Sequence, residues 1–351
     1  MYLGPAIASY DLVYETISTA LYQLFIAPKG FYVVNLRRIA AIVGLVVVLS
    51  FALKGNAGAG IDGFPAGLVV ADDRSLHHLN LYVAQELGLF KKHGIDVSLM
   101  EARDPVAARD LVLSGRADIF WACPTLAIMD IANGAPLKII AQAKTPCNSV
   151  LVVAKSSAVR TIADLKGKRI AGLSANCEGV LAYQVKAQEK GGGFLVVVEA
   201  GGRSLIDLAA GKIDGAILEE PYLSMAERRG FRAVQRETAS RFPCRTINAR
   251  TSIIRENPEG VRRLLAAINE ANSIIARDPA SAKILAITER YTGFPEKAVK
   301  PGISQFTFSE KIDERRIDRL VEEMLAAGII RENPRERLYS TELKGITWGR
   351  K

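Results

Sequence analysis

The chain has 351 residues, of which 49% are hydrophobic and 24% are charged, a composition typical of a globular protein long enough for two domains. Its formal net charge is +9, but the basic residues are spread along the chain. Because no long basic run and no basic–aromatic interleaving occurs, the sequence argues against a nucleic-acid-binding protein.

Residues 1–60 differ in character from the rest of the chain. Arg37 and Arg38 precede an uncharged apolar stretch at 39–53, and the small residues Ala57 and Ala59 follow it. A basic segment, an apolar stretch of about 7–15 residues and an A-x-A-like site together form a secretory signal. We therefore predict a signal or N-terminal targeting region at 1–60 and an exported protein. An uncleaved membrane anchor is the alternative, although a spanning helix needs about 20 apolar residues.

The following part of the chain alternates strand-like apolar runs with helical patterns. Strands are expected at 67–73, 95–101, 117–123, 137–143 and 149–154, and helices at 81–90, 105–114 and from Pro124 up to Asn133. Strands that alternate with helices predict parallel strands covered on both faces. In such sheets, ligands bind outside the carboxyl ends of the strands.

A second set of elements repeats this style. A capping box is expected at 161–164, strands at 170–174, 194–200 and 213–219, and helices up to about 190, at 204–210 and from Pro221. The repetition indicates a second α/β lobe. After an extended segment at 245–254, the chain is expected to be helical at 258–277, 279–291 and 309–327, without new strands, and to pack on an existing sheet.

Short segments then recur in a recognisable order. They are YVAQELGLFKKHGIDV at 82–97, LSGRADI at 113–119, NGAPLK at 133–138, SVLVV at 149–153, DLKGK at 164–168, AGKIDGA at 210–216, EPY at 220–222 and NPE at 257–259. Each segment alone is a weak signal, but the ordered set resembles exported ABC-transporter solute-binding proteins. The class is the nitrate/taurine/sulfonate group, which includes thiamine-pyrimidine-binding relatives.

The resemblance implies an α/β, two-lobed type II periplasmic-binding-protein fold with two crossover strands and a C-terminal helical segment. We expect lobe 1 at 66–152 plus 245–351 and lobe 2 at 153–244. The implied function is a periplasmic receptor that captures a small polar organic or anionic solute, such as a sulfonate, nitrate or a pyrimidine, by hinge closure. The implied partners are an ABC permease and ATPase at the inner membrane.

The resemblance also implies that turns after strands and helix N-termini, which attract anions, line the cleft. The expected ligand-binding residues are His77, His78, Asn80, Cys123, Thr125, Thr145, Cys147, Asn148, Ser149, Ser174, Asn176, Cys177, Glu178, Glu220 and Tyr222. The alternative for each Ser, Thr and Asn is a helix cap or a turn residue, since these residue types favour such positions. No catalytic residue, metal or cofactor is predicted.

The four cysteines depart from the usual family pattern. In an exported protein they could pair, and four cysteines allow three connectivities. One interpretation makes them buried small hydrophobes or a disulfide within a lobe. The other is a thiol-lined pocket for a soft metal or a redox-sensitive clamp. Cys123 and Cys177 lie at expected helix N-termini, which predicts lowered thiol pKa values.

Two pairs of residues, one of histidines and one of glutamates, bear on which ligand could bind. His77 and His78 are neighbours in an extended turn, so their side chains are expected to point apart and not to share one metal. Glu178 and Glu220 bring negative charge near the cleft, which favours a cationic or zwitterionic ligand if both face it. This conflicts with a sulfonate or nitrate ligand, and the sequence leaves the ligand open.

The main alternative is an enzyme on the same fold, such as a pyrimidine synthase or a dehydratase, because fold alone does not decide function. The chain has no G-x-S-x-G, G-x-x-x-x-G-K-[ST] or H-E-x-x-H motif. It also lacks the clustered run of cysteines that pyrimidine-synthase relatives use for iron. We therefore predict a binding protein and not an enzyme.

Overall fold

A computed structural model describes residues 67–199, 201–340 and 342–343. The predicted signal region at 1–60 lies outside these described residues. Among the described helices, none is both long enough and apolar enough to cross a membrane.

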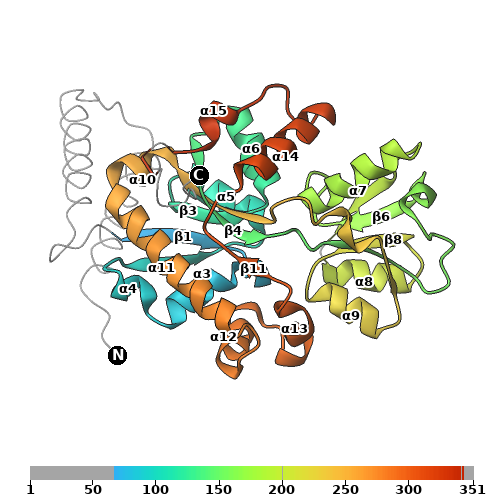
Figure 1. The fold of residues 1–351 in the computed structure, drawn as a ribbon, viewed down its shortest axis with the longest axis horizontal. Helices are drawn as coiled ribbons and strands as arrows, with labels where there is room; N and C mark the ends of the chain where they lie inside the picture. Colours follow the sequence, from blue (N-terminus) through green and yellow to red (C-terminus); the bar gives the residue numbers. More distant parts are fainter. Residues whose placement is uncertain (1–66, 200, 341, 344–351) are drawn as a thin grey trace, which may run out of the picture. The chain divides into compact units, whose positions relative to one another are not determined.

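The first sheet has six strands in the order β11-β4-β10-β3-β1-β2 (Figure 1). The strands are β1 Leu68–Asp72, β2 Val97–Glu101, β3 Ile119–Ala122, β4 Leu137–Thr145, β10 Arg245–Arg250 and β11 Thr307–Phe308. Strand β1 is parallel to β2 and β3. Strand β10 lies between β3 and β4 and is antiparallel to both, because the chain re-enters this sheet from the second one. The parallel arrangement predicted from the strand–helix alternation is thus correct for β1–β3, whereas β5, the strand expected at 149–154, is antiparallel to its neighbours.

The second sheet has five strands in the order β7-β6-β8-β5-β9. They are β5 Val150–Val153, β6 Arg169–Gly172, β7 Leu195–Val198, β8 Gly215–Leu218 and β9 Arg232–Val234. Strand β6 is parallel to β7 and β8, and β5 is antiparallel to β8 and β9. Although the predicted lobe 1 extends to residue 152, β5 pairs within the second sheet. The lobe boundaries as a whole stay a prediction.

Helices cover both faces of the first sheet (Figure 1). On one face lie α3 Leu79–Glu86, α4 Leu89–Lys92, α10 Thr251–Glu256, α11 Pro258–Arg277, α12 Ala282–Thr292 and α13 Glu296–Ile303. On the other lie α5 Pro105–Leu113, α6 Pro124–Ala132, α14 Glu314–Ala326 and α15 Arg335–Leu338. The second sheet is covered by α7 Glu178–Glu189 on one face and by α8 Gly201–Ala209 and α9 Tyr222–Arg228 on the other.

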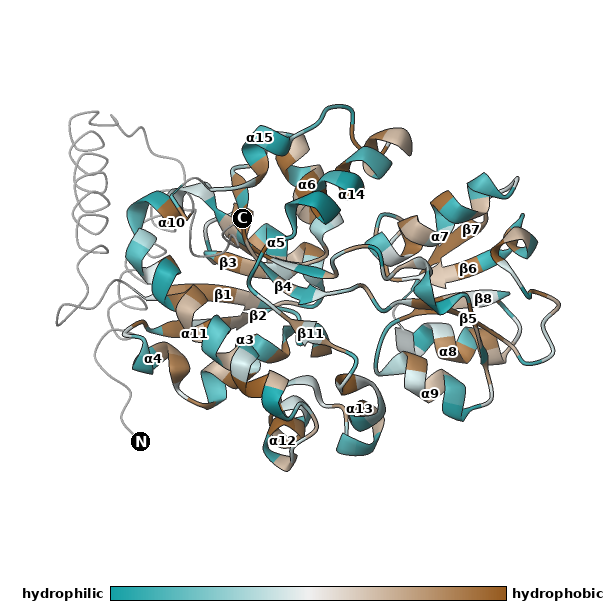
Figure 2. Cartoon of the chain, in the orientation of Figure 1, coloured by the Kyte–Doolittle hydropathy of each residue, from teal (hydrophilic) through white to brown (hydrophobic). Residues whose placement is uncertain are grey.

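Alternate side chains of each central strand enter different cores, as the pleat of a strand requires. Phe120 packs in the core under α5 and α6, whereas Trp121 packs in the core under α3 and α11. The strands are therefore apolar on both faces, which Figure 2 shows as hydrophobic colour along the strands and mixed colour on the helices. The continuous apolar runs of the sequence are explained by this double coverage.

The predicted α/β periplasmic-binding-protein fold is confirmed, with local corrections. The extended segment predicted at 245–254 ends at Arg250, where α10 begins. The expectation of no new strand after 258 is wrong, because β11 pairs with β4. Strand β9 and helix α13 were not predicted. Strands of two or three residues, such as β11 and β9, are too short to display a period.

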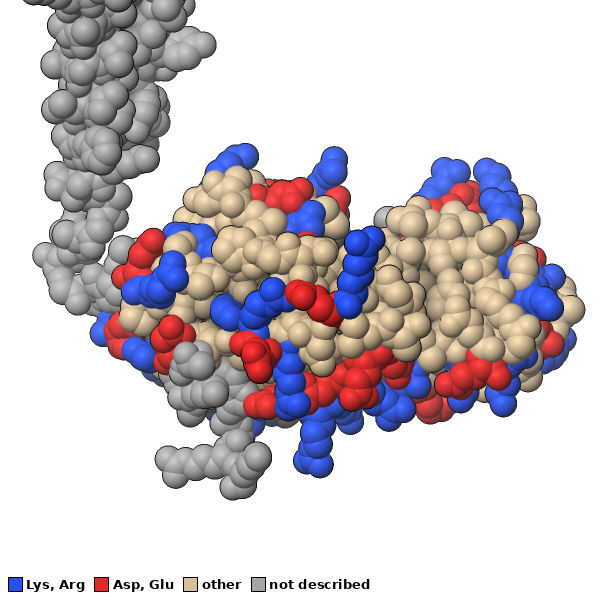
Figure 3. All heavy atoms as spheres, turned by 90° about the horizontal axis from the view of Figure 1, so that it is seen from above, with Lys and Arg blue, Asp and Glu red and all other residues tan. Residues whose placement is uncertain are grey.

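Charged residues of both signs are interspersed on the face drawn in Figure 3. In the described chain, exposed charged side chains form short-range ion pairs, such as Lys300 with Glu296. Pairs of this kind contribute at most about 1 kcal/mol each. The basic net charge is accordingly spread over a mixed surface on this face.

Candidate functional site

Two cavities lie where residues of both sheets meet. The first, the thiol cavity, has a volume of about 480 Å³. It is lined by Asp104, Pro105, Val106, Arg109, Cys123, Thr125, Leu126, Met129, Leu173, Ser174, Asn176, Cys177 and Val198. The second, the carboxylate cavity, has about 250 Å³ and is lined in part by Asp73, Glu199, Glu219, Glu220, Tyr222 and Arg245. Leu173 lines both, so the two cavities adjoin.

The thiol cavity brings together five of the predicted ligand-binding residues. Cys123 and Thr125 come from the start of α6, and Ser174, Asn176 and Cys177 from the turn before α7. Cys123 and Cys177 are the N-cap residues of these helices, and their side chains make no capping hydrogen bond. The positive ends of two helices from different sheets therefore meet at one cavity.

The walls of the thiol cavity are largely apolar. Val106, Leu173 and Val198 line it and are among the large hydrophobic side chains with the greatest exposure in the described chain, at 45%, 37% and 64%. Exposed apolar side chains that gather in a concave site indicate a ligand with an apolar part.

All four cysteines converge beside this cavity as free, buried thiols. The sulfur of Cys123 lies 4.0 Å from that of Cys177. Cys147 donates to Ser149 Oγ at 3.2 Å, and its sulfur lies within 4.8 Å of ligand atoms of Glu178 and Cys244. Because Cys123 and Cys177 begin helices on different sheets, a bond between these two would not be a disulfide within a lobe.

Arg245 is the buried centre of the cluster. Its side chain is 2% exposed, and Nη1 donates to Cys123 Sγ at 3.1 Å and to the Cys244 carbonyl at 3.0 Å. The same nitrogen lies 3.6 Å from Glu178 Oε1, while Nη2 contacts both Glu219 oxygens at 3.4 Å. Through these contacts, the first residue of β10 joins groups of the second sheet.

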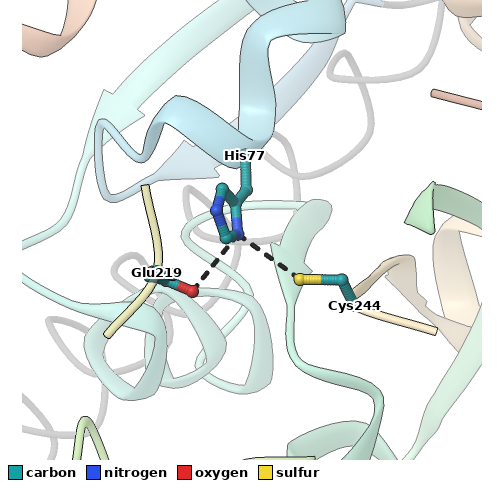
Figure 4. Close-up of side chains that lie close together, drawn as sticks. All are labelled: His77, Glu219 and Cys244. Carbon is teal, nitrogen blue, oxygen red and sulfur yellow. Dashed lines mark hydrogen bonds and ion pairs between the residues drawn. The ribbon is translucent and has the colours of Figure 1, made fainter. Parts of the chain in front are cut away.

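His77, Glu219 and Cys244 form a compact group (Figure 4), and Arg245 contacts the last two of them. His77 Nδ1 lies 3.3 Å from Glu219 Oε2 and 3.4 Å from Cys244 Sγ. Figure 4 shows the sulfur and the carboxylate approaching the same ring nitrogen. The neutral imidazole has one N–H donor at that nitrogen, which these two acceptors share.

Burial and neighbouring charges shift the pKa values of residues in this cluster. Although burial raises the pKa of Cys244, the hydrogen bond from Cys147 and the nearby cations Lys144 and Arg245 lower it well below its ordinary value. Burial raises the pKa of Glu178 to about 8, against the opposing effect of Arg245. The nearby cations thus favour the thiolate form of Cys244.

The prediction that the thiols of Cys123 and Cys177 have lowered pKa values is wrong. The hydrogen bond to Cys177 and burial both raise the pKa of Cys123. The hydrogen bond from Cys123 lowers the pKa of Cys177, but burial and the nearby Glu178 raise it further than that. At these two positions, each 7% exposed, desolvation disfavours the thiolate.

His77 and His78 bind different partners, as predicted, although they lie on a 3-10 turn, η2 Leu76–His78, and not in an extended one. His78 Nδ1 lies 2.8 Å from Asp72 Oδ1 and 3.2 Å from Asp73 Oδ1, and its side chain is buried. Since Tyr82 also donates to Asp72 Oδ1 at 3.1 Å, this group holds η2 against the end of β1.

Other predicted site residues have contacts that place them outside the thiol cavity. Asn80 donates to Asn272 Oδ1 at 3.0 Å in the core under α11, and Asn148 donates to the Gln305 carbonyl at 2.9 Å. Thr145 ends β4 and precedes a cis proline. Tyr222 packs edge-on against Phe294. The contacts of Asn80 and Asn148 are those of structural residues.

The two predicted acidic residues differ from expectation. Glu178 is fully buried beside Arg245 and does not line either cavity. Glu220 lines the carboxylate cavity, but its oxygens accept from the Ser224 amide at 3.2 Å and hydroxyl at 3.0 Å. Neither residue is part of the lining of the thiol cavity.

Several cluster residues were missed by sequence reasoning. Arg245, Cys244 and Lys144 were not among the expected ligand-binding residues, and buried Lys144 donates from Nζ to the Pro146 carbonyl at 2.9 Å. Arg245 begins β10, whose sequence RTINAR shows no apolar run, so no local signal indicated that this charge is buried.

The chain matches the model of the family described as NMT1/THI5 like over residues 75–282. It belongs to this family. The resemblance inferred from the ordered segments, including the thiamine-pyrimidine relatives, is thereby confirmed. Among relatives by sequence is the 4-amino-5-hydroxymethyl-2-methylpyrimidine phosphate synthase THI13 of Saccharomyces cerevisiae, 25% identical over 228 residues. The match covers 59% of this NMT1/THI5-like chain and 65% of the yeast protein.

A putative thiamine biosynthesis protein of Haemophilus influenzae is 32% identical over 94 residues, which are 26% of this chain and 30% of that protein. The chain therefore spans less than two thirds of the length of these curated relatives.

Solved structures show the same fold. The periplasmic aliphatic sulphonate binding protein SsuA of Escherichia coli aligns with a TM-score of 0.68 at 18% identity, covering 82% of this chain and 96% of SsuA. The desulfurization enzyme DSZB aligns with a TM-score of 0.59 at 15% identity, covering 79% and 97%. The fold thus occurs in both binding proteins and enzymes, and at these identities the likeness concerns the fold alone.

Proposed function

We propose that this protein is an exported, periplasmic solute-binding receptor of an ABC importer, which takes a small organic anion in the thiol cavity and closes around it by a hinge motion. The permease and ATPase of the importer would be its partners at the inner membrane. The observation that carries the proposal is the thiol cavity itself, to which residues from both sheets contribute.

The volume and lining of the cavity favour this ligand class. Small-molecule sites measure about 300–1,000 Å³, a range that includes the thiol cavity at 480 Å³ but not the carboxylate cavity at 250 Å³. The N-termini of α6 and α7 favour an anionic group, and Thr125 and Asn176 offer polar contacts. The apolar walls favour an organic substituent over bare nitrate. A sulfonate or carboxylate on an alkyl or aromatic group meets these requirements.

A second candidate is an enzyme on the same fold. It is favoured by the group of His77, Glu219 and Cys244, in which a thiol of lowered pKa lies beside an imidazole. The names of the yeast synthases among the relatives agree with this class of function. Because Cys244 is fully buried, a substrate would reach it only after the two halves separate.

Calorimetry of the purified protein against alkyl and aryl sulfonates, nitrate, pyrimidines and their phosphates tests the proposal. We expect saturable binding at one site per chain, tightest for an anion with an apolar substituent. Binding of nitrate alone would contradict the ligand class. If the protein turned over any of these compounds without saturable tight binding, the enzyme would be the better-supported function and the receptor would be rejected.

A further inference from the structure

We propose that Cys123, Cys177 and Glu178 form a binding site for a thiophilic divalent cation, for which Zn²⁺ is the probe, on the wall of the thiol cavity. The site goes beyond the proposed receptor function, since solute capture does not require a metal. The three ligand atoms lie within 4.8 Å of one another.

The spacing of the donors fits one ion. Two sulfurs that each bind a zinc ion at about 2.3 Å lie about 3.8 Å apart at a tetrahedral angle and about 4.0 Å apart at a trigonal one. The sulfurs of Cys123 and Cys177 are 4.0 Å apart. Glu178 Oε2 lies 3.7 Å from Cys177 Sγ, which makes the carboxylate the third donor. The pair of sulfurs already has the separation that a shared ion requires.

The carboxylate carries an independent sign of a missing partner. Glu178 is fully buried, and its Oε1 has no hydrogen-bond partner among the described residues. The guanidinium of Arg245 lies 3.6 Å from this oxygen, beyond hydrogen-bond distance. A buried carboxylate oxygen that accepts no hydrogen bond has only this ion pair with Arg245 to compensate its lost hydration. A bound cation would give the Glu178 carboxylate a direct electrostatic contact in place of the hydrogen bond that Oε1 lacks.

The charges around the site balance those of a metal complex. A divalent cation held by two thiolates and a carboxylate carries net negative charge. Arg245, whose Nη1 donates to Cys123 Sγ at 3.1 Å, supplies the opposite charge next to it. Groups that hydrogen-bond to metal ligands in this way orient them and tune the affinity.

Access distinguishes this site from its neighbour. Cys147, Glu178 and Cys244 also bring their ligand atoms within 4.8 Å, but all three side chains are fully buried. Cys123 and Cys177 are each 7% exposed and line the thiol cavity. An ion can therefore reach them from the cavity, and a fourth coordination position would face the cavity, as in zinc sites that keep a position for water or another ligand.

The metal would also link the two halves of the fold. Cys123 precedes α6, which covers the first sheet, and Cys177 precedes α7, which covers the second. An ion shared between these sulfurs ties the two helix N-termini together.

Titration of the reduced, metal-free full chain with Zn²⁺ against a chromophoric chelator tests the site, and Co²⁺ absorption reports thiolate ligation. We expect one Zn²⁺ per chain and a cobalt spectrum with thiolate charge-transfer bands. Cys123→Ser and Cys177→Ser should each weaken binding by more than the roughly 10–100-fold typical of an outer-shell group. Glu178→Gln keeps the shape of the side chain and should also weaken zinc binding. This variant tests the site even if a serine variant fails to fold.

Cys147→Ser is the matched control, because it removes a thiol of the neighbouring group and leaves the proposed ligands intact. Its zinc affinity should stay within a few-fold of that of the wild type. Loss of binding in Cys147→Ser but not in Cys123→Ser would assign the metal to the other group, and absence of Zn²⁺ binding by the folded wild type would overturn the site. Solute calorimetry on chelator-treated protein separates this result from the receptor function.

Discussion

The guanidinium of Arg245 and the carboxylate of Glu178 form a buried ion pair, with Nη1 and Oε1 3.6 Å apart and side chains 2% and 0% exposed. Arg245 begins β10 in the first sheet, and Glu178 begins α7 on the second. The pair therefore joins the two halves at the point where the thiols gather.

Removal of Arg245 should destabilise the protein strongly. Above about pH 8, where Glu178 is ionised, Arg245→Met leaves its carboxylate buried without a counter-charge, and breaking a buried pair from one side typically costs about 3–5 kcal/mol. Urea unfolding of wild type and variant measures this loss. In a Glu178→Gln background, the same substitution should cost clearly less. Equal losses in both backgrounds would show that the two side chains do not interact.

Tyr183 should contribute through its hydroxyl group. The hydroxyl accepts from the Leu151 amide at 3.0 Å and donates to the Gln235 carbonyl at 2.9 Å, so it connects β5 with the segment after β9. Tyr183→Phe leaves a buried amide without a partner, which costs about 1–3 kcal/mol in free energy of unfolding. Tyr82→Phe is a matched control, because Asp72 keeps His78 as a partner. A loss for Tyr183→Phe no larger than that for Tyr82→Phe would contradict this role.

Acidification should destabilise the protein through His77. Burial lowers the pKa of His77 below its ordinary value; Glu219 and Cys244 oppose this shift, and Lys144 and Arg245 add to it. Between the folded-state pKa and about 6.5, the unfolded chain binds a proton here that the folded chain does not. The free energy of unfolding should therefore fall as the pH decreases below about 6.5.

His77→Gln should flatten this part of the profile, because glutamine does not titrate. Urea unfolding at a series of pH values from neutral to mildly acidic compares the two proteins. Parallel profiles for wild type and variant would exclude His77 as the source of the pH dependence.

The apolar wall of the thiol cavity should determine solute affinity. Val198→Asp places a charge on the wall where the proposed anion carries its apolar part, and we expect at least a tenfold loss of affinity, equivalent to about 1.4 kcal/mol. Leu195→Asp is the matched control on the same strand, since Leu195 is 62% exposed against 64% for Val198 but does not line the cavity. Calorimetry with the tightest-binding solute measures both. Similar losses in the two variants would place the solute elsewhere.

Periodicity predicted most elements with ends shifted by a few residues, because apolar runs and helix caps are local properties. The helix expected from Pro124 is α6, and that expected at 258–277 is α11. Strand β10 was recognised as extended but not as an antiparallel insertion between β3 and β4. Pairing partners depend on where distant segments meet, which a local pattern does not record.

The candidate site was also predicted only in part from the sequence. Cys123, Thr125, Ser174, Asn176 and Cys177 were predicted as cleft residues because they follow strands, and these five line the thiol cavity. Their role in binding stays a prediction. The partners of the cysteines and the burial of Glu178 and Arg245 could not be predicted, since contacts between residues 54, 122 and 167 positions apart decide them.

The sequence by itself determined the family and the alternation of strands and helices, because residue order and local apolar patterns are sufficient for both. Only the tertiary structure decided that all four thiols meet beside one arginine and that Glu178 lacks a hydrogen-bond partner at one oxygen. The burial of side chains and the distances between remote ones are set only when the chain folds. These quantities determine which groups are charged and what they can bind.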